Sequence, residues 1–273
     1  MQLARPDGYN LNVEEVGSGF PLIVLHGGPG LDHSMFRPYL DPLGDEYGVL
    51  YVDERGQGRS QRVDPATLSL EVFARDVDLL AETLELDGFA LLGHSFGAII
   101  ATYHATELGT AAAYVISAGG DSSAALDADV GAALDALDDG KAIAQSWEDE
   151  KTVETDAQFM QLLRDQLPFH FHGDPPPGWG DETVPSPEVL RHFARAGYGD
   201  FDYGPKLKDV QKPTLVIVGE YDRTTTPRAA RVLHEGIRES ELHVVPDAGH
   251  LSFVEQTDDY LSAVRDFLAR TAQ

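Results

Sequence analysis

The sequence contains no cysteine. Disulfide bonds, cysteine nucleophiles and cysteine-ligated zinc or iron–sulfur centres are therefore excluded. Long apolar runs are also missing, since those at residues 22–25 and 214–218 are far shorter than the ~20 residues that cross a bilayer. The first ten residues lack the apolar segment of a signal peptide. These absences predict a cytoplasmic protein with no membrane-spanning segment.

Basic residues are scarce: 20 lysines and arginines stand against 46 aspartates and glutamates, which gives a net charge of −26. Nucleic acid and anionic membrane surfaces are poor partners for so acidic a chain. Residues 121–205 alone carry 18 acidic and 5 basic side chains. Because most surface charge faces water, we interpret this excess as solvation, with attraction of cationic substrates as the alternative.

The chain has 273 residues, a length that suits one large domain, or one domain carrying an insertion. Short apolar segments alternate with helical patterns in two parts of it. Strands that alternate with helices pair in parallel through right-handed crossovers. The sequence therefore predicts an α/β fold, a doubly wound, mostly parallel sheet with helices on both faces, built from residues 1–120 and 206–273. Strands are predicted at residues 10–16, 21–26, 48–53, 88–94, 111–119, 212–220 and the start of 241–250, and helices at 69–86 (with Ser69 as N-cap), 98–108, 227–237 and 257–270.

Residues 121–205 interrupt this alternation. They are rich first in alanine and aspartate, with a helical pattern, and then in aromatic residues, histidine and proline. Their many large apolar side chains argue against disorder. We predict a mostly helical cap that is inserted between the two halves of the sheet domain and lies over the carboxyl end of the sheet. A separate domain or a linker is the alternative.

The sequence GHSFG, residues 93–97, lies between a predicted strand and a predicted helix. A serine on such a sharp turn is held out above the sheet, where its hydroxyl is accessible. Gly93 and Gly97 leave room for the close backbone approach that the turn requires. The positive end of the following helix also favours the negative charge that develops during attack. This pattern predicts Ser95 as a nucleophile.

A serine hydroxyl needs a base to take its proton, and the base needs an acid to orient it. His250 is the favoured base among the ten histidines, because its loop follows the last predicted strand at the carboxyl end of the sheet. Asp222 is the favoured acid, in the loop after the strand at residues 212–220. Glu220 and Asp247 are its competitors.

The glycine-rich sequence HGGPG, residues 26–30, follows the predicted strand at residues 21–26. Glycines there let the backbone turn tightly and present amide groups, which the oxyanion of a tetrahedral intermediate needs. We predict the backbone N–H groups of Gly28 and Phe96 as the donors, with a tight turn alone as the alternative. The spacing matches neither a Walker loop nor a dinucleotide fingerprint. Chemistry of this kind requires no metal and no organic cofactor.

Five motifs stand in the order found in the α/β-hydrolase superfamily, which the sequence resembles. They are HGGPG (26–30), DERGQGRS (53–60), GHSFG (93–97), GEYD (219–222) and GHLSF (249–253). The order Ser95, Asp222, His250 is the nucleophile–acid–base order of that superfamily. The resemblance implies a serine hydrolase, because haloalkane dehalogenases and epoxide hydrolases of this fold carry aspartate at the nucleophile position.

The motif HGGPG is similar to that of the prolyl iminopeptidase group, which removes amino-terminal proline from peptides. The sequence QSWEDE, residues 145–150, resembles the Trp-Glu motif in the cap of those enzymes. The resemblance implies that Glu148, beside Trp147, binds the free amino group of the substrate. A partly buried carboxylate pairs well with an ammonium group, since a water-poor pocket strengthens the attraction.

Three functions remain open from the sequence. The first is a proline iminopeptidase-like aminopeptidase or amidase. The second is a carboxylesterase on short acyl esters, with Phe169, Phe171 and Trp179 forming an acyl pocket. The third is a non-catalytic binding protein of the same fold, which the complete set of Ser95, Asp222 and His250 disfavours. The two enzyme hypotheses predict a small molecule or a short peptide as the partner.

Overall fold

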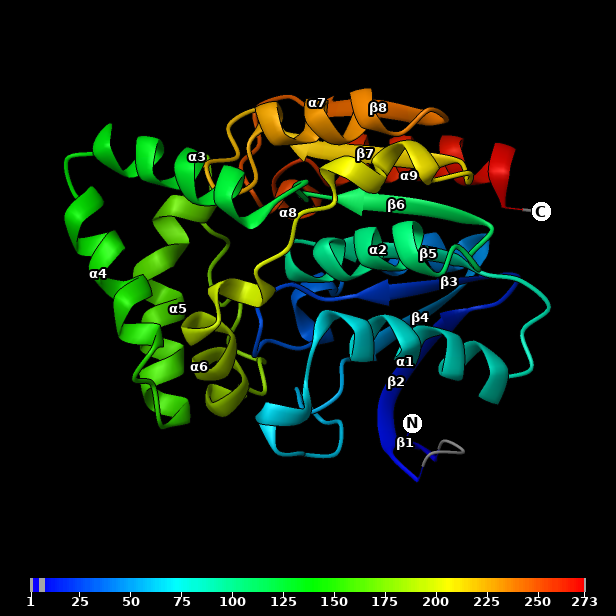
Figure 1. Cartoon of the computed structure of the whole chain (residues 1–273), viewed down its shortest axis with the longest axis horizontal. Helices are drawn as coiled ribbons and strands as arrows, with labels where there is room; N and C mark the ends of the chain where they lie inside the picture. The colour runs from blue at the N-terminus through cyan, green and yellow to red at the C-terminus, as the bar shows by residue number, and fades with distance from the viewer. Residues whose placement is uncertain (1, 5–7, 273) are drawn as a thin grey trace.

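A β-sheet of eight strands forms the centre of the part of the chain that the structure, a computed structural model, describes: residues 2–4 and 8–272 (Figure 1). The strand order is β1-β2-β4-β3-β5-β6-β7-β8. β2 pairs antiparallel with β1 and β4, and the other neighbouring strands pair in parallel. The strands are β1 (Gln2–Ala4), β2 (Asn10–Gly17), β3 (Phe20–Leu25), β4 (Tyr47–Asp53), β5 (Ala90–His94), β6 (Ala113–Ser117), β7 (Thr214–Gly219) and β8 (Ser240–Val245).

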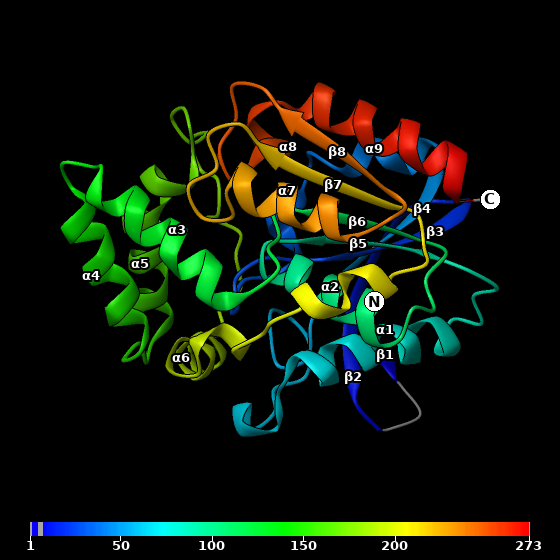
Figure 2. The same ribbon diagram turned by 45° about the horizontal axis from the view of Figure 1, so that its top comes forward.

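Helices cover both faces of this sheet (Figure 2). Strand residues alternate between the two faces: in β7, Val216 and Val218 join the core on one face, while Leu215 and Ile217 join the core on the other. A strand covered on both faces has to be apolar throughout, which is why the strands stand out as continuous apolar runs. One face carries α1 (Leu70–Thr83), α2 (Phe96–Glu107) and α7 (Pro227–Gly236), and the other carries α8 (Ser252–Glu255) and α9 (Thr257–Thr271).

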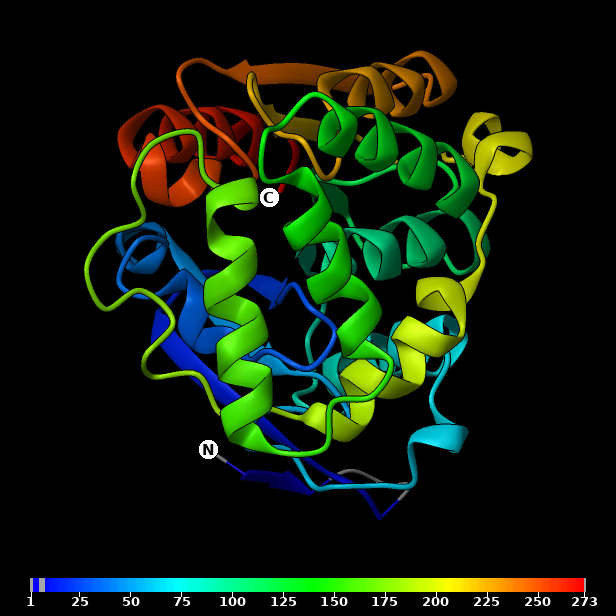
Figure 3. The same cartoon turned by 90° about the vertical axis from the view of Figure 1, so that its left-hand side faces the viewer.

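Four more helices lie between β6 and β7 in the chain and stand beyond one end of the sheet (Figures 1 and 3). They fall in the segment predicted as a cap, residues 121–205, and we keep that name for it; the rest of the molecule is called the body. The cap helices are α3 (Ser123–Asp135), α4 (Gly140–Glu150), α5 (Asp156–His170) and α6 (Pro187–Arg195).

The cap joins the body at a narrow neck, which we define as residues 121–123 and 201–203. Ser122 and Asp202 form an antiparallel bridge there. The backbone N–H of Tyr203 donates to the carbonyl of Asp121 at 2.7 Å, and the N–H of Ser123 donates to the carbonyl of Phe201 at 3.0 Å. The chain therefore enters and leaves the cap through two segments that are hydrogen-bonded to each other.

The predicted fold class is confirmed, and so is Ser69 as N-cap of α1, where its side chain accepts from the N–H of Val72. The sequence did not indicate β1 or α8, which span three and four residues and are too short to show a period. No helix within the described residues is long and apolar enough to span a bilayer. Short 3₁₀ helices complete the described structure at His33–Phe36, Asp41–Asp45, Pro65–Thr67, Gly197–Gly199 and Gly204–Asp209.

Candidate active site

Ser95 occupies a strained turn between β5 and α2. Its φ of 55° and ψ of −114° lie in a region that residues with a side chain rarely adopt. Its N–H donates to the carbonyl of Ser117 at the end of β6, at 2.9 Å. A Cβ at Gly93 would overlap the carbonyl oxygen of Gly97, and a Cβ at Gly97 would overlap that of Leu25. The two glycines therefore allow the helix to pack close enough to the sheet to hold this turn.

His250 and Asp222 form a hydrogen-bonded pair in two neighbouring loops. His250 Nδ1 lies 2.9 Å from Asp222 Oδ2, and both side chains are buried. Burial alone would raise the pKa of Asp222. Electrostatic attraction to His250, together with hydrogen bonds from His250 and Thr225, outweighs burial and lowers this pKa below its ordinary value. The Asp222 carboxylate also accepts from the N–H groups of Thr224 and Thr225, at 2.8 and 2.9 Å, and from the Thr225 hydroxyl at 2.8 Å.

Two further histidine rings lie against His250. The ring centroids of His94 and His170 are 4.9 and 5.2 Å from that of His250. Burial, followed by repulsion from His250, lowers the pKa of His170 to about 3 and that of His94 well below 6.5. Both neighbours are therefore uncharged at neutral pH.

The glycine-rich loop after β3 approaches Ser95 closely. A Cβ at Gly27 would lie 3.2 Å from the Cβ of Ser95, and Gly28 and Phe96 line the same cavity as Ser95. Phe96 is the first residue of α2, where a backbone N–H has no acceptor within the helix. The geometry is compatible with both predicted oxyanion donors.

A buried ion pair supports this loop. His26 Nε2 lies 2.8 Å from Glu54 Oε2, and His26 Nδ1 lies 2.7 Å from the carbonyl oxygen of Gly27. Burial favours the neutral imidazole, but Glu54 and Asp53 outweigh burial and raise the pKa of His26 to about 9. His26 is therefore an imidazolium that can donate to Gly27 and to Glu54 together.

A cavity of about 460 Å³ lies between the body and the cap. The body lines it with the glycine-rich loop, Ser95, Thr224, Thr225 and His250, and Asp222 lies behind His250. The described residues contain no group of three or more His, Asp or Glu side chains that could hold a metal ion. The cap contributes a mainly apolar wall that includes Leu126, Trp147, Phe159, Leu162, Leu167 and Trp179.

Comparison with known proteins identifies this architecture. A family model described as "alpha/beta hydrolase fold" matches residues 21–257. The chain belongs to the α/β-hydrolase family. It is 30% identical to a proline iminopeptidase of Saccharolobus solfataricus, over 96% of this chain and 94% of the relative, and 25% identical to a pimeloyl-[acyl-carrier protein] methyl ester esterase of Legionella pneumophila, over 95% and 99%. Among solved structures, a proline iminopeptidase-related protein of Thermus thermophilus is 28% identical with a TM-score of 0.76, over 97% of this chain and 95% of that one.

The family comparison shows a hydrolase, whereas the roles of individual side chains in this α/β hydrolase stay predictions. The structure brings Ser95, His250, Gly28 and Phe96 to one cavity, with Asp222 bonded to His250. The two competing acids lie elsewhere: Glu220 is exposed and its carboxylate faces the N–H of Asp247, at 3.4 Å.

The expectation of a partly buried carboxylate at Glu148 is wrong. Glu148 lines the cavity, but its side chain is 63% exposed and forms an ion pair with Lys151. The buried carboxylate is Glu150, which accepts from Gln166 Nε2 at 2.7 Å and from the Tyr198 hydroxyl. Burial, which outweighs both hydrogen bonds, raises the pKa of Glu150 to about 7.

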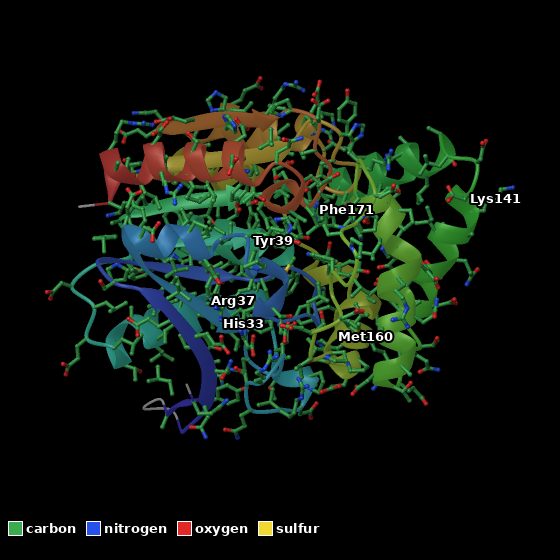
Figure 4. The ribbon with its side chains drawn as sticks, turned by 180° about the vertical axis from the view of Figure 1, so that it is seen from behind. His33, Arg37, Tyr39, Lys141, Met160 and Phe171 are labelled. Carbon is green, nitrogen blue, oxygen red and sulfur yellow. The ribbon has the colours of Figure 1, made fainter. Side chains whose placement is uncertain are left out.

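The predicted aromatic lining needs a similar correction. Phe169 and Phe171 are buried but are not among the described residues that line the cavity. Their rings pack edge-on against those of Trp147 and Trp179, at 4.9 and 5.5 Å between centroids, and it is the two tryptophans that face the cavity. Figure 4 shows Phe171 where the cap meets the body, far from Lys141 at the outer side of the cap. The two phenylalanines therefore support the wall from behind.

Several residues of the site were not predicted from the sequence. Thr225 could have been found, because an aspartate side chain commonly accepts from backbone N–H groups that follow it closely in a loop. The partnership of His26 with Glu54 had a weaker signal, since both lie in recognised motifs but 28 positions apart. His170 had none, because only the fold of the cap places it against His250.

Proposed function

We propose that this α/β hydrolase cleaves an amide or ester through an acyl-enzyme on Ser95. The observation that carries the proposal is the 2.9 Å hydrogen bond between Asp222 and His250 Nδ1, at a cavity that Ser95 also lines. With Nδ1 held by the carboxylate, Nε2 is the nitrogen that exchanges protons. The strained turn at Ser95 supports the same role, since such strain is typical of nucleophile elbows.

The proposed reaction has two acyl-transfer steps. His250 Nε2 takes the proton of Ser95 as Oγ attacks the carbonyl carbon, and the N–H groups of Gly28 and Phe96 stabilise the oxyanion. His250 then gives this proton to the leaving amine or alcohol, which departs and leaves an ester on Ser95. Water, deprotonated by His250, attacks that ester, and the carboxylic acid and the free hydroxyl are released.

For the substrate, we propose a small molecule or short peptide with a free amino-terminal residue, proline being the first candidate. Similarity to proline iminopeptidases supports this choice. The cap wall of the cavity also includes Asp127 and Glu148 against Lys151, a balance that attracts an ammonium group. A cytoplasmic location and a lack of nucleic-acid and membrane partners stay predictions from the sequence.

A carboxylesterase on short acyl esters is the second candidate. The observation in its favour is that both oxygens of Glu150 are bonded within the chain, to Gln166 and Tyr198, while most of the remaining cap wall is apolar. Similarity to a methyl ester esterase points the same way. An acyl chain would bury its surface against Leu162 and Trp179.

One pair of substrates separates the candidates. Purified protein is assayed on proline p-nitroanilide and on p-nitrophenyl acetate and butyrate, beside Ser95→Ala. We expect anilide cleavage by the wild-type chain and a loss of roughly 10³-fold or more in Ser95→Ala. Fast ester cleavage without anilide cleavage would replace the peptidase with the esterase. Near wild-type rates in Ser95→Ala would contradict the acyl-enzyme itself.

The amino-group site has its own test. Glu148→Gln should raise the KM for the proline anilide and leave the KM for the esters unchanged, because only the anilide carries an ammonium group. Asp149→Asn is the matched control. Asp149 is an exposed acid on the same helix; it accepts a hydrogen bond from Gln145 and is not among the described residues that line the cavity. Equal KM values in the two variants would remove Glu148 from the site.

A further inference from the structure

The loop that carries His250 is tied to the cap by the carboxylate of Glu255. Its Oε2 accepts from the backbone N–H of Gly249 in the loop, at 2.7 Å. Its Oε1 accepts from the N–H groups of His172 and Gly173, which follow α5 in the cap, at 2.9 and 2.8 Å. One side chain therefore joins the loop of the predicted base to the end of a cap helix.

The two backbones also touch directly beside Glu255. The N–H of His250 donates to the carbonyl of His170 at 2.7 Å. A Cβ at Gly249 would lie 2.7 Å from both the carbonyl oxygen of His170 and the nitrogen of His172. The residue before His250 thus has no space to shift toward the cap, and a shift away from the cap would break the hydrogen bond of His250.

The loop after β7 meets the same turn of the cap. His170 Nδ1 lies 3.0 Å from the Thr224 hydroxyl, and Arg223 donates to the carbonyl of Pro168 at 3.2 Å. The His170 ring also lies against the ring of His250. The end of α5 therefore contacts both loops that carry the predicted acid and base.

We propose that Glu255 is a positioning residue for His250. By hydrogen-bonding the loop that carries His250 to the end of α5 in the cap, Glu255 fixes the place of the imidazole relative to Ser95. The inference rests on the proposed function, because it gives Glu255 a role only through His250. A carboxylate suits the task, since its two oxygens accept from three donors through charge-assisted hydrogen bonds. Nothing in the proposed reaction requires Glu255 to touch the substrate.

Glu255→Gln tests this role with little change of volume. A glutamine has one acceptor oxygen, so its NH₂ group must face the N–H of Gly249 or the two N–H groups of the cap, and one side of the link is lost. We expect kcat to fall roughly ten- to hundredfold with KM within about twofold, because misplaced catalytic groups slow the chemical step. The rate at which an alkyl fluorophosphonate labels Ser95, with loss of fluoride, should fall in parallel.

Glu241→Gln is the matched control. Glu241 is an exposed glutamate at the start of β8, away from the site, and is paired with Arg270. A residue that only stabilises the fold would lower the Tm and leave kcat unchanged well below the Tm; that result for Glu255→Gln would overturn the inference. If the wild-type chain neither hydrolyses the esters and the anilide nor reacts with the fluorophosphonate, the proposed function has failed instead.

A second pair of variants tests the link from the cap side, should Glu255→Gln not fold. Gly173 is exposed, and Gly173→Pro removes one of the two cap N–H groups that donate to Glu255. Gly173→Ala keeps that N–H, and its Cβ would lie 3.7 Å from Glu255 Oε1, an ordinary contact. We expect a several-fold loss of kcat in Gly173→Pro and none in Gly173→Ala. Equal kcat values for the two would argue against the link.

Discussion

Glu150 is a carboxyl group that its surroundings hold in the protonated form up to about pH 7, because burial opposes its ionisation. Since the ordinary pKa is 4.5, the folded protein binds this proton more tightly than the unfolded chain does. Stability is therefore lost as the pH rises from about 4.5 to about 7, by up to about 3 kcal/mol. Glu150→Gln removes this ionisation.

We accordingly predict that Glu150→Gln raises the Tm at pH 8 by several degrees and changes it little at pH 5, as measured by thermal unfolding at both pH values. Glu148→Gln is the control on the same helix, and because Glu148 is 63% exposed, it should change the Tm little at either pH. A Tm that falls equally at both pH values in Glu150→Gln would mean that the bonds to Gln166 and Tyr198 outweigh the ionisation.

Glu54 should matter to catalysis without touching the substrate. In the trans peptide between Gly27 and Gly28, the carbonyl and the N–H point in opposite directions. By holding the Gly27 carbonyl, charged His26 sets the direction of the Gly28 N–H, and Glu54 keeps His26 charged. We predict that Glu54→Gln lowers kcat about tenfold with little change in KM, measured by steady-state kinetics. The exposed Glu71 supplies the control, Glu71→Gln, and equal kcat values in the two variants would contradict this role.

At the scale of elements, the contact between α2 and β3 depends on a missing side chain. A Cβ at Gly97 would overlap the carbonyl of Leu25 and lie 2.7 Å from that of His26, and neither backbone group can move aside. We predict that Gly97→Ala lowers the Tm by many degrees and abolishes hydrolysis. Gly131→Ala in α3 is the opposite case, because nothing lies within 4 Å of its Cβ, so it should stabilise by about 0.5–1 kcal/mol. A wild-type Tm in Gly97→Ala would refute the packing argument.

The body of the molecule was predictable because each of its elements carries a local signal. Its strands are covered on both faces, so they appear in the sequence as apolar runs. The turn at Ser95 combines glycines at fixed offsets with a strand before it and a helix after it. Asp222 and His250 could be placed for the same reason, since each follows a strand whose carboxyl end lies at the same edge of the sheet.

The cap was less predictable because its signals are not local. Glu148 and Glu150 are two residues apart on α4, so they lie on different sides of the helix, and the sequence does not say which side is buried. The answer depends on Gln166 and Tyr198, which are 16 and 48 positions away from Glu150. The prediction that Phe169 and Phe171 line the cavity failed for a similar reason, since each ring lies behind a tryptophan from another part of the cap.

At the scale of the whole molecule, the net charge of −26 implies strong repulsion among surface carboxylates. The screening length, beyond which salt largely cancels such repulsion, falls from about 10 Å at 0.1 M salt to about 3 Å at 1 M. We predict that the Tm rises by several degrees between 50 mM and 1 M NaCl. The same curve in KCl would show that screening, rather than a sodium site, is responsible. A Tm that is flat or falls with salt would mean that attractive surface pairs outweigh the repulsion.

The neck has a consequence for how such a protein diversifies. Since Asp121 and Tyr203 are already hydrogen-bonded across it, a short turn could close the body there, and a different cap could be grafted at the same two points. Such a graft would also discard residues 168–173, which contact the loops of Asp222 and His250. Exchanging the whole cap should thus disturb the proposed catalytic groups along with substrate choice, whereas a chimera that retains this short stretch should keep their contacts with the cap.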